Sequence, residues 1–235
     1  MKMYGEFAKW WHLLSAVEEY VEEASVYARM LREIGKGEAR TVLELGAGGG
    51  NNAFYLKRDF AMTLTDVAEG MLAESRKINP ECEHFVGDMR RLRLGREFDR
   101  VFVHDAICYM TTRKELREAV ETAFVHCKPG GAALFCPDFT KENFEASTDC
   151  GGNDVEGRAM RYLEWVHAPR EGESAYEVDY VLVMREGEGE TIVVQERHQE
   201  GVFSLAEWME VLGEVGFAGR VLENEGRFCL VGERG

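Results

Sequence analysis

The chain has few of the residues that mark disulfide-rich and zinc-binding proteins. Its six cysteines are scattered along 235 residues, and no two of them form a Cys-x-x-Cys pair. Paired spacing is what a zinc site or a disulfide framework requires, so the sequence predicts neither and indicates a reducing compartment. The cysteines are expected to be small apolar packing residues. They are Cys82, Cys108, Cys127, Cys136, Cys150 and Cys229.

Positive charge is also scarce. Lysine and arginine number 28 against 43 aspartate and glutamate residues, which gives a formal net charge of −15. Proteins that bind DNA or RNA take most of their affinity from cation–phosphate contacts and need a basic groove. The composition therefore argues against nucleic acid, and equally against an anionic membrane surface, as a partner.

Long apolar runs are missing as well. The first residues, MKMYGEFAKWWHLL, have no apolar core followed by a small-residue cleavage site, and no uninterrupted apolar stretch is long enough to span a bilayer. We therefore expect a cytoplasmic protein. With 45% hydrophobic residues, the chain is long enough for one sizeable core and an inserted subdomain.

Between residues 40 and 136, short apolar segments alternate with segments of helical length. Five segments are apolar and rich in β-branched or aromatic residues, as in strands: 41–45, 60–65, 83–86, 99–103 and 131–136. The predicted helices lie before and between them, at 18–34, 51–57, 68–78 and 113–126. This alternation predicts a parallel sheet covered on both faces. A Lys-Pro-Gly-Gly turn at 128–131 is expected to precede the fifth strand.

Beyond Pro137 the alternation stops. Three strands, predicted at 160–166, 175–184 and 191–198, are joined by charged, glycine-containing turns, which is typical of an antiparallel meander. A helix at 205–215 and a hairpin of strands at 217–222 and 227–231 follow. The predicted organisation is a helical cap (1–38), a nucleotide-binding domain (39–138 and 202–235) and a three-stranded insertion (139–201).

A glycine cluster follows the first predicted strand. Residues 42–52 read VLELGAGGGNN, with Glu44 before Gly46, Gly48 and Gly50. Glycines at this point let the backbone turn sharply and approach a ligand without interference from a Cβ atom. Ligands of open α/β sheets bind beyond the carboxyl ends of the strands.

Two familiar glycine loops do not match this cluster. A dinucleotide fingerprint, GxGxxG, would need glycine at position 51, which is Asn51. A phosphate-binding loop would need Lys-Ser or Lys-Thr after its last glycine, and neither follows. An NAD-dependent oxidoreductase stays as an alternative function, although Asn51 and the acidic strand ends count against it.

The cluster instead resembles the first motif of class I S-adenosylmethionine-dependent methyltransferases. The similarity continues along the chain in TLTDVAEGML, FVGDMRRL, HDAICYM and the KPGG turn. It implies a Rossmann-like, doubly wound α/β fold with a mostly parallel seven-stranded sheet and an antiparallel C-terminal hairpin. The insertion and the ending ERHQEGVFSLAEWMEVLGEVGF are similar to the small-molecule branch, which includes sugar N,N-dimethyltransferases of antibiotic pathways.

The resemblance implies S-adenosyl-L-methionine as the cofactor and carboxylates as its main ligands. Asp66 would bind both ribose hydroxyls, Asp88 the adenine amino group, and Glu44 would lie nearest the amino-acid part. Carboxylates suit this cofactor because it is cationic at sulfur and lacks phosphate. Asp66 as a helix N-cap is the alternative. The expected cofactor-binding residues are Glu44, Gly46, Ala47, Gly48, Asn51, Asp66, Val67, Met71, Gly87, Asp88, Met89, His104 and Tyr20.

The acceptor side is expected to use groups near the strand ends and the insertion. Methyl transfer from a sulfonium is an in-line displacement, and a protonated amine or a hydroxyl acceptor needs a base. We predict Asp105, Tyr109 and His198 as the catalytic residues acting on a small amine or hydroxyl acceptor. A non-catalytic S-adenosylmethionine-binding protein is a further alternative.

Two further expectations concern metal and aromatic residues. Asp105 and Asp138, with Asn143, are the carboxylate and amide groups that a Mg²⁺ site would use, but we expect no metal. One or two N-terminal aromatic residues are expected to lie near the cofactor, where an aromatic face attracts a sulfonium. Tyr162 and Trp165 are candidates for the acceptor pocket, and core packing is the expected role of at least one of them. The N-terminal aromatic residues are Tyr4, Phe7, Trp10, Trp11 and Tyr20.

Overall fold

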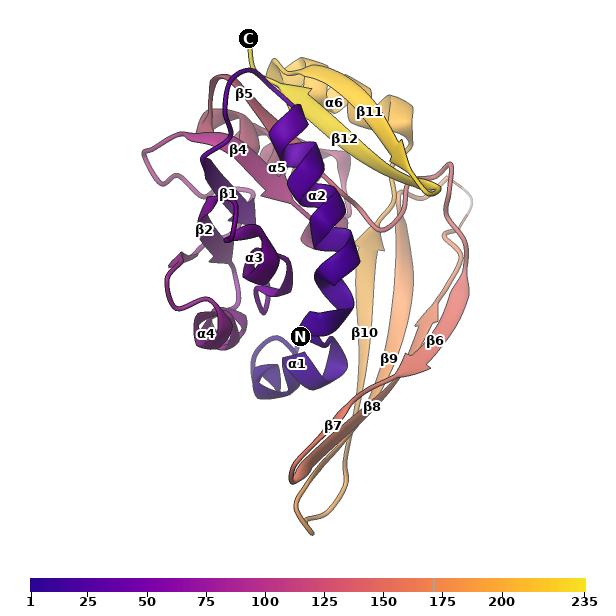
Figure 1. The fold of residues 1–235 in the computed structure, drawn as a ribbon. Helices are drawn as coiled ribbons and strands as arrows, with labels where there is room; N and C mark the ends of the chain where they lie inside the picture. Colours follow the sequence, from indigo (N-terminus) through magenta and orange to yellow (C-terminus); the bar gives the residue numbers. More distant parts are fainter. Residues whose placement is uncertain (171) are drawn as a thin grey trace.

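The computed structural model describes residues 1–170 and 172–235, which form two sheets (Figure 1). The larger sheet has the strand order β11-β12-β5-β4-β1-β2-β3. Its strands are β1 (Thr41–Leu45), β2 (Ala61–Asp66), β3 (Glu83–Val86), β4 (Phe98–Val103), β5 (Cys127–Phe135), β11 (Ala218–Asn224) and β12 (Arg227–Glu233). The first five pair in parallel, and β12 runs antiparallel to both of its neighbours. The predicted mostly parallel seven-stranded sheet with a C-terminal hairpin is confirmed.

Helices cover both faces of this sheet. The helices are α2 (Val21–Glu33), α3 (Asn51–Leu56), α4 (Glu69–Ile78), α5 (Arg113–His126) and α6 (Leu205–Val215). One apolar cluster joins α2 and α3 to the sheet, and a second joins α5 and α6 to the opposite face. Capping boxes begin α5 and α6: Thr112 with Glu115, and Ser204 with Glu207. Gly216 ends α6 with a φ of 109°, a conformation that favours glycine.

The strand order reverses beside β1. Strand β1 lies between β2 and β4: the sheet continues from β1 through β2 to β3 on one side, and through β4 to β5 on the other. The loops after these neighbouring strands separate and leave a crevice at their carboxyl ends, which is where ligands of open α/β sheets bind. The glycine cluster follows β1 directly and therefore lies at this crevice.

The insertion forms a second, antiparallel sheet with more strands than predicted. Its strands are β6 (Ser147–Gly151), β7 (Asp154–Val155), β8 (Arg158–Val166), β9 (Ala175–Glu186) and β10 (Ile192–Gly201). Three strands were predicted, and the structure adds β6 and β7, which both pair with β8. The sequence of β6, STDCG, is polar and short, so it lacks the apolar alternation by which a strand is detected.

The Lys-Pro-Gly-Gly segment is not a separate turn. Strand β5 begins at Cys127 and includes residues 128–131, with a register shift against β4 between Phe98 and Arg100. Gly130 has a φ of 78°, which only glycine adopts readily. The expected turn is therefore an irregularity inside the strand.

The N-terminal segment connects the two sheets. It contains η1 (Ala8–Trp10), α1 (Trp11–Leu14) and η2 (Val17–Tyr20), followed by α2. Met3, Trp10 and Leu13 pack in one apolar cluster with residues of β8, β9 and β10. No helix in residues 1–170 and 172–235 is long and apolar enough to cross a membrane.

Candidate active site

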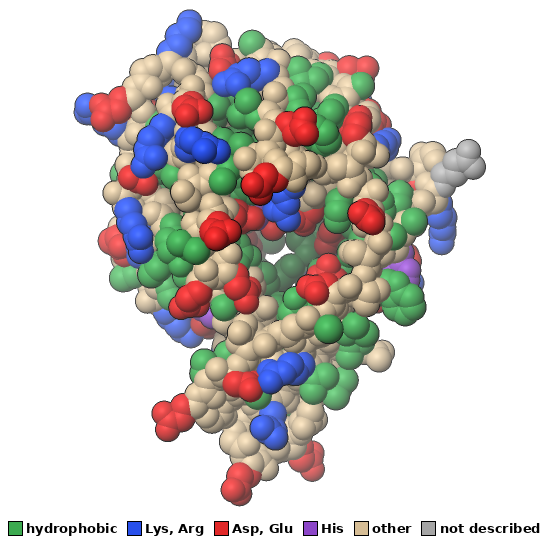
Figure 2. Space-filling view, turned by 45° about the vertical axis from the view of Figure 1, so that its right-hand side comes forward, with side chains coloured by type: hydrophobic (Ala, Val, Ile, Leu, Met, Phe, Trp, Pro, Cys, Tyr) green, Lys and Arg blue, Asp and Glu red, His purple; other side chains and the backbone are tan. Residues whose placement is uncertain are grey.

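A cavity of about 830 Å³ lies at the crevice beside β1. Its walls come from the loops after the parallel strands, from the N-terminal segment and from the inner face of the antiparallel sheet. Figure 2 shows its mouth as a hollow near the middle of the molecule, with acidic side chains around it. Its size is within the range of pockets that hold a small molecule.

The glycine cluster forms one wall of the cavity. Gly46, Gly48 and Gly50 have φ values of 77°, 53° and 79°, which disfavour other residues. A Cβ atom on Gly46 would lie 2.2 Å from the Cβ of Ala106, so the loop after β1 and the segment after β4 approach each other only because this residue is glycine. The glycines therefore shape the wall for backbone approach, as the sequence predicted.

Asp66 ends β2 and holds the glycine loop. Its two oxygens accept hydrogen bonds from the amides of Gly48 (2.9 Å) and Ala68 (2.8 Å). The N-cap of α4 is Ala68, with no side-chain hydrogen bond, so Asp66 is not the cap that was considered as its alternative role. Burial raises the pKa of Asp66, while these backbone amides oppose that rise. A carboxylate oxygen has two lone pairs, which leaves acceptor capacity toward the cavity.

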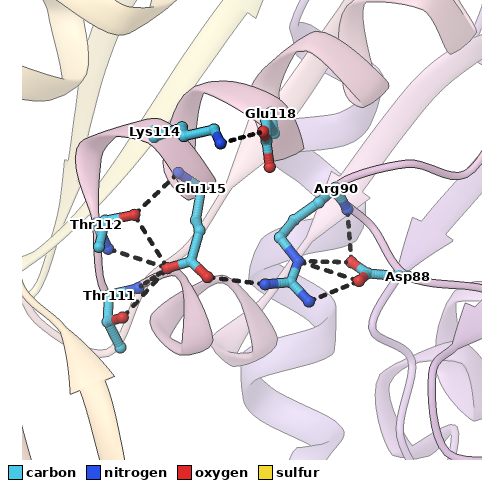
Figure 3. A network of polar contacts seen from close by, with 7 residues as sticks. All are labelled: Asp88, Arg90, Thr111, Thr112, Lys114, Glu115 and Glu118. Atoms are coloured by element: carbon cyan, nitrogen blue, oxygen red, sulfur yellow. Dashed lines mark hydrogen bonds and ion pairs between the residues drawn. The ribbon is translucent and has the colours of Figure 1, made fainter.

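Asp88 follows β3 and is held by Arg90. The guanidinium donates to both carboxylate oxygens of Asp88, at 2.6 Å from Nη2, and to Glu115 at 2.7 Å (Figure 3). Thr111 and Thr112 donate in turn to the same Glu115. The hydrogen bonds from Arg90 hold the pKa of Asp88 below its ordinary value. Asp88 is therefore an ionised acceptor in a fixed orientation at the cavity wall.

Several buried polar atoms at the cavity have no partner among the described residues. Glu44 is 2% exposed and its Oε2 accepts no hydrogen bond; the same holds for Oδ1 of Asn51, and Nε1 of Trp11 donates none. Burial raises the pKa of Glu44 to about 8. Unpartnered buried polar atoms are costly, so they indicate a polar ligand. Polar groups of a ligand bound in this cavity would supply the missing donors and acceptors.

A second acidic group lies where β4 and β5 end. Nε2 of His104 lies 3.1 Å from a carboxylate oxygen of Asp105 and 3.3 Å from one of Glu23. The same nitrogen lies 3.0 Å from the hydroxyl of Tyr27. Burial, then the charge and hydrogen bond of Asp138, raise the pKa of Asp105 well above its ordinary value. Asp105 is therefore a stronger base than an ordinary carboxylate.

A chain of hydrogen bonds leads from the cavity into the insertion. The hydroxyl of Tyr4 lies 2.6 Å from that of Tyr109, which lies 3.1 Å from Nδ1 of His198; Nε2 of His198 lies 3.3 Å from Glu196. Burial lowers the pKa of His198, so the ring is neutral, and an ionised Glu196 only accepts. The proton is therefore on Nε2, Nδ1 accepts from Tyr109, and Tyr4 donates to Tyr109.

The structure brings nearly all predicted site residues to this one cavity. Every expected cofactor-binding residue lines it, as do Asp105 and Tyr109. His198 does not: its side chain is 4% exposed and lies one hydrogen bond behind Tyr109. Val67 is also notable, since it lines the cavity yet remains 71% exposed.

The aromatic predictions are partly wrong. Trp165 is 54% exposed, stacks on His167 and does not line the cavity, because it faces away on the outer side of β8. Tyr162 does not line it either and packs against the N-terminal segment instead. Of the N-terminal aromatic residues, Tyr4, Trp11 and Tyr20 line the cavity. Trp10 and Phe7 pack in the apolar cluster.

The sequence reasoning missed much of the acceptor wall. Glu23, Arg90 and Arg227 carry charge into the cavity wall, and the insertion adds a set of acidic and aromatic residues. The alternation of strand residues was a usable signal, because residues two apart share a sheet face. The wall residues from the insertion are Phe139, Ser147, Asp149, Glu164, Val166, Tyr176, Val178, Tyr180 and Glu200.

Comparison with known proteins agrees with this site. Residues 42–131 match the family described as methyltransferase domain. The chain is 29% identical over 222 residues to dTDP-3-amino-3,4,6-trideoxy-alpha-D-glucopyranose N,N-dimethyltransferase from Streptomyces venezuelae, which covers 92% of this chain and 91% of that protein.

Two solved structures are similar over the whole length. DesVI from Streptomyces venezuelae has a TM-score of 0.85 and 25% identity, covering 97% of this chain and 98% of that one. CalS10 from Micromonospora echinaspora, an amino pentose methyltransferase solved with S-adenosylmethionine bound, shares the fold with a TM-score of 0.77, 22% identity and 92% coverage of each chain. With the glycine loop and the carboxylates at one cavity, these likenesses support a class I S-adenosylmethionine-dependent methyltransferase similar to the sugar N-methyltransferases.

Proposed function

We propose that this methyltransferase methylates an amino group of a sugar-like small molecule. The observation that carries the proposal is the acidity of the cavity wall beyond the cofactor carboxylates, which Asp105, Glu164 and Glu200 line together. An amine arrives at neutral pH as an ammonium ion, which such a wall attracts. The Streptomyces venezuelae relative is named as acting on an amino sugar, and its similarity supports the same acceptor class here.

The cofactor would be held by three carboxylates and the glycine loop. Glu44 and Asn51 would take the amino-acid part, Asp66 the ribose and Asp88 the adenine. When bound, S-adenosylmethionine supplies an electrophilic methyl group on a positively charged sulfur. What the protein must add is alignment of the nucleophile, which contributes about 7–11 kcal/mol in well-oriented reactions.

Asp105 and Tyr109 would prepare the amine. An ammonium has no lone pair, so it must lose a proton before it reacts, and the raised pKa of Asp105 makes this carboxylate the best-placed base. The Tyr109 hydroxyl donates a hydrogen bond to His198 and accepts one from Tyr4. Its second lone pair is free to accept a hydrogen bond from an N–H of the substrate amine. His198 is then a positioning residue that acts through Tyr109.

The test is a methylation assay with matched acceptors. The enzyme is given S-adenosylmethionine and a panel of amino sugars, free and nucleotide-linked, each paired with the sugar that has hydroxyl in place of the amine. S-adenosylhomocysteine release and the mass of the product are measured. We expect methyl transfer to the amines alone. Equal transfer to the hydroxyl sugars would contradict the proposal, and cofactor binding with no transfer to any acceptor would favour a binding protein.

A further inference from the structure

Trp11 brings a buried hydrogen-bond donor to the cavity wall. Its Nε1 has no acceptor within residues 1–170 and 172–235, although the residue lines the cavity. Three other wall residues have buried polar atoms without partners, and all of these atoms are acceptors: Oε2 of Glu44 and Oδ1 of Asn51 and Asn52. A buried indole N–H without an acceptor is costly, so it indicates a ligand atom that accepts a hydrogen bond.

The indole lies against the glycine loop. A Cβ atom on Gly49 would lie 2.1 Å from Cδ1 and 2.4 Å from Nε1 of Trp11, so this edge of the ring reaches the loop only because the residue is glycine. Two contacts hold the backbone around it: Nε2 of His12 lies 3.2 Å from the carbonyl oxygen of Gly49, and Nδ2 of Asn51 donates to the carbonyl oxygen of Ser15 at 3.0 Å. The donor is therefore held at the loop, close in the chain to Asn51.

The unpartnered atoms of this part of the wall match a zwitterion. Carboxylate and amide oxygens, as in Glu44 and Asn51, accept hydrogen bonds from an ammonium group, whereas the indole N–H can only donate. The amino-acid part of S-adenosylmethionine has both an ammonium and a carboxylate. Its carboxylate enters a cavity that ten carboxylate side chains line, and a buried charge without hydrogen-bond partners is costly. A neutral donor at the wall removes part of that cost.

We propose that Trp11 is a cofactor-binding residue whose indole N–H donates a hydrogen bond to the carboxylate of the amino-acid part of S-adenosylmethionine. This rests on the proposed placement of that part at Glu44 and Asn51, and deepens it. The contact differs from the attraction of a sulfonium to an aromatic face, because it uses the edge of the ring and a ligand group of opposite charge. The N-terminal segment then completes the cofactor site that the loop after β1 begins.

The proposal is tested by calorimetry with two matched ligands. S-adenosylhomocysteine has the carboxylate, and decarboxylated S-adenosylhomocysteine keeps the adenosine, the sulfur and the ammonium but lacks it. Trp11→Phe keeps an aromatic ring and removes the N–H. We expect this variant to bind S-adenosylhomocysteine roughly tenfold or more weakly and to bind the decarboxylated ligand with little change. Trp165→Phe, on the outer side of β8 and 54% exposed, is the matched control and leaves both affinities unchanged.

A second measurement follows the donor itself. The chain has four tryptophans, and the indole resonance of Trp11 in a proton–nitrogen correlation spectrum is the one that Trp11→Phe removes. We expect S-adenosylhomocysteine to move this resonance downfield, as a new hydrogen bond to a carboxylate does, and the decarboxylated ligand to move it less.

The outcomes separate this inference from the proposed function. Equal losses of affinity for both ligands in Trp11→Phe would show that the ring acts by packing and would overturn the inference, as would unchanged affinity for S-adenosylhomocysteine. If the variant does not fold, the wild-type spectrum decides, because four indole resonances that respond alike to both ligands would also overturn it. All of these results leave amine methylation in place, whereas methylation of no amine would contradict the proposed function and leave the Trp11 contact in place.

Discussion

The two halves of the cavity satisfy their carboxylates in different ways. At the cofactor half, Asp66 accepts from the backbone amides of Gly48 and Ala68, and Asp88 accepts from Arg90, so each is oriented by the protein itself. At the insertion half, Glu200 has only a tyrosine hydroxyl. The first arrangement is preorganised for one constant ligand.

In the second arrangement the protein satisfies the carboxylate only in part, so further hydrogen bonds to it must come from the ligand. A wall of alternate strand residues can be changed one position at a time without disturbing the glycine loop. The comparison shows that the carboxylates fixed by the protein itself follow the parallel strands, whereas the less constrained Glu200 lies on the antiparallel sheet. The following experiments break or sharpen that contrast.

Asp66→Asn should have the largest effect. An amide nitrogen would face one of the two backbone amides that the carboxylate now accepts, so the loop loses a hydrogen bond and the ribose loses a charged acceptor. We expect S-adenosylhomocysteine affinity to fall by roughly 100-fold or more, measured by calorimetry. Asp59→Asn, at a partly exposed ion pair with Arg32, is the control. Retained affinity in Asp66→Asn would show that the loop does not depend on this carboxylate.

Tyr109→Phe tests the acceptor half. Removing the hydroxyl breaks the chain between Tyr4 and His198 and removes the acceptor for the substrate N–H. We expect kcat to fall roughly 10- to 100-fold with little change in cofactor affinity. Tyr55→Phe, on α3 and away from the cavity, should leave kcat unchanged. A Tyr109→Phe enzyme with normal kcat and raised KM would assign this tyrosine to binding alone.

Glu44 makes the cofactor-free protein sensitive to pH. The pKa of Glu44 in the folded protein, about 8, is above the ordinary glutamate value, so folding favours the neutral form of this side chain. The contribution of neutral Glu44 to the free energy of unfolding is therefore present at low pH and is lost as pH rises through about 8. We expect the Tm to fall by about 5 °C or more between about pH 5 and pH 9, and less in Glu44→Gln. Glu121→Gln, on the surface of α5, should follow the wild type. Parallel curves for the wild type and Glu44→Gln would contradict the assignment.

Arg90→Met should have the smallest effect. Arg90 lowers the pKa of Asp88, so the stability from this pair is present at neutral pH and lost as pH falls through the depressed pKa of Asp88. The pair is about a third exposed, so we expect a loss of only about 0.5–1 kcal/mol at neutral pH, measured by urea unfolding, which shrinks in acid. Arg117→Met, with exposed partners on α5 and α6, is the matched comparison. A constant difference across pH would mean that Arg90 acts by packing rather than by charge.

The cofactor half was predictable because its signals are local. The order of Glu44, Gly46 and Gly48 after an apolar strand, and the acids Asp66 and Asp88 after the next two, need only the rule that parallel strands end at one edge. Each of these residues lies at the cavity that this rule implies. The strand–helix alternation likewise predicted the five parallel strands of the larger sheet, and the family resemblance implied the complete seven-stranded sheet.

The acceptor half needed tertiary structure. Whether an insertion strand directs its odd or its even residues inward depends on what packs against the sheet, and here Met160, Leu182 and Met184 pack on the N-terminal segment. That contact turns Glu164 inward and Trp165 outward, and a shift of one residue would reverse both. The position of His198 behind Tyr109 was likewise decided by the packing of η3 (Asp105–Tyr109) on β10, between residues that are distant in sequence. The sequence alone therefore determined what donates the methyl group, and only the packing of two sheets decided what meets the acceptor.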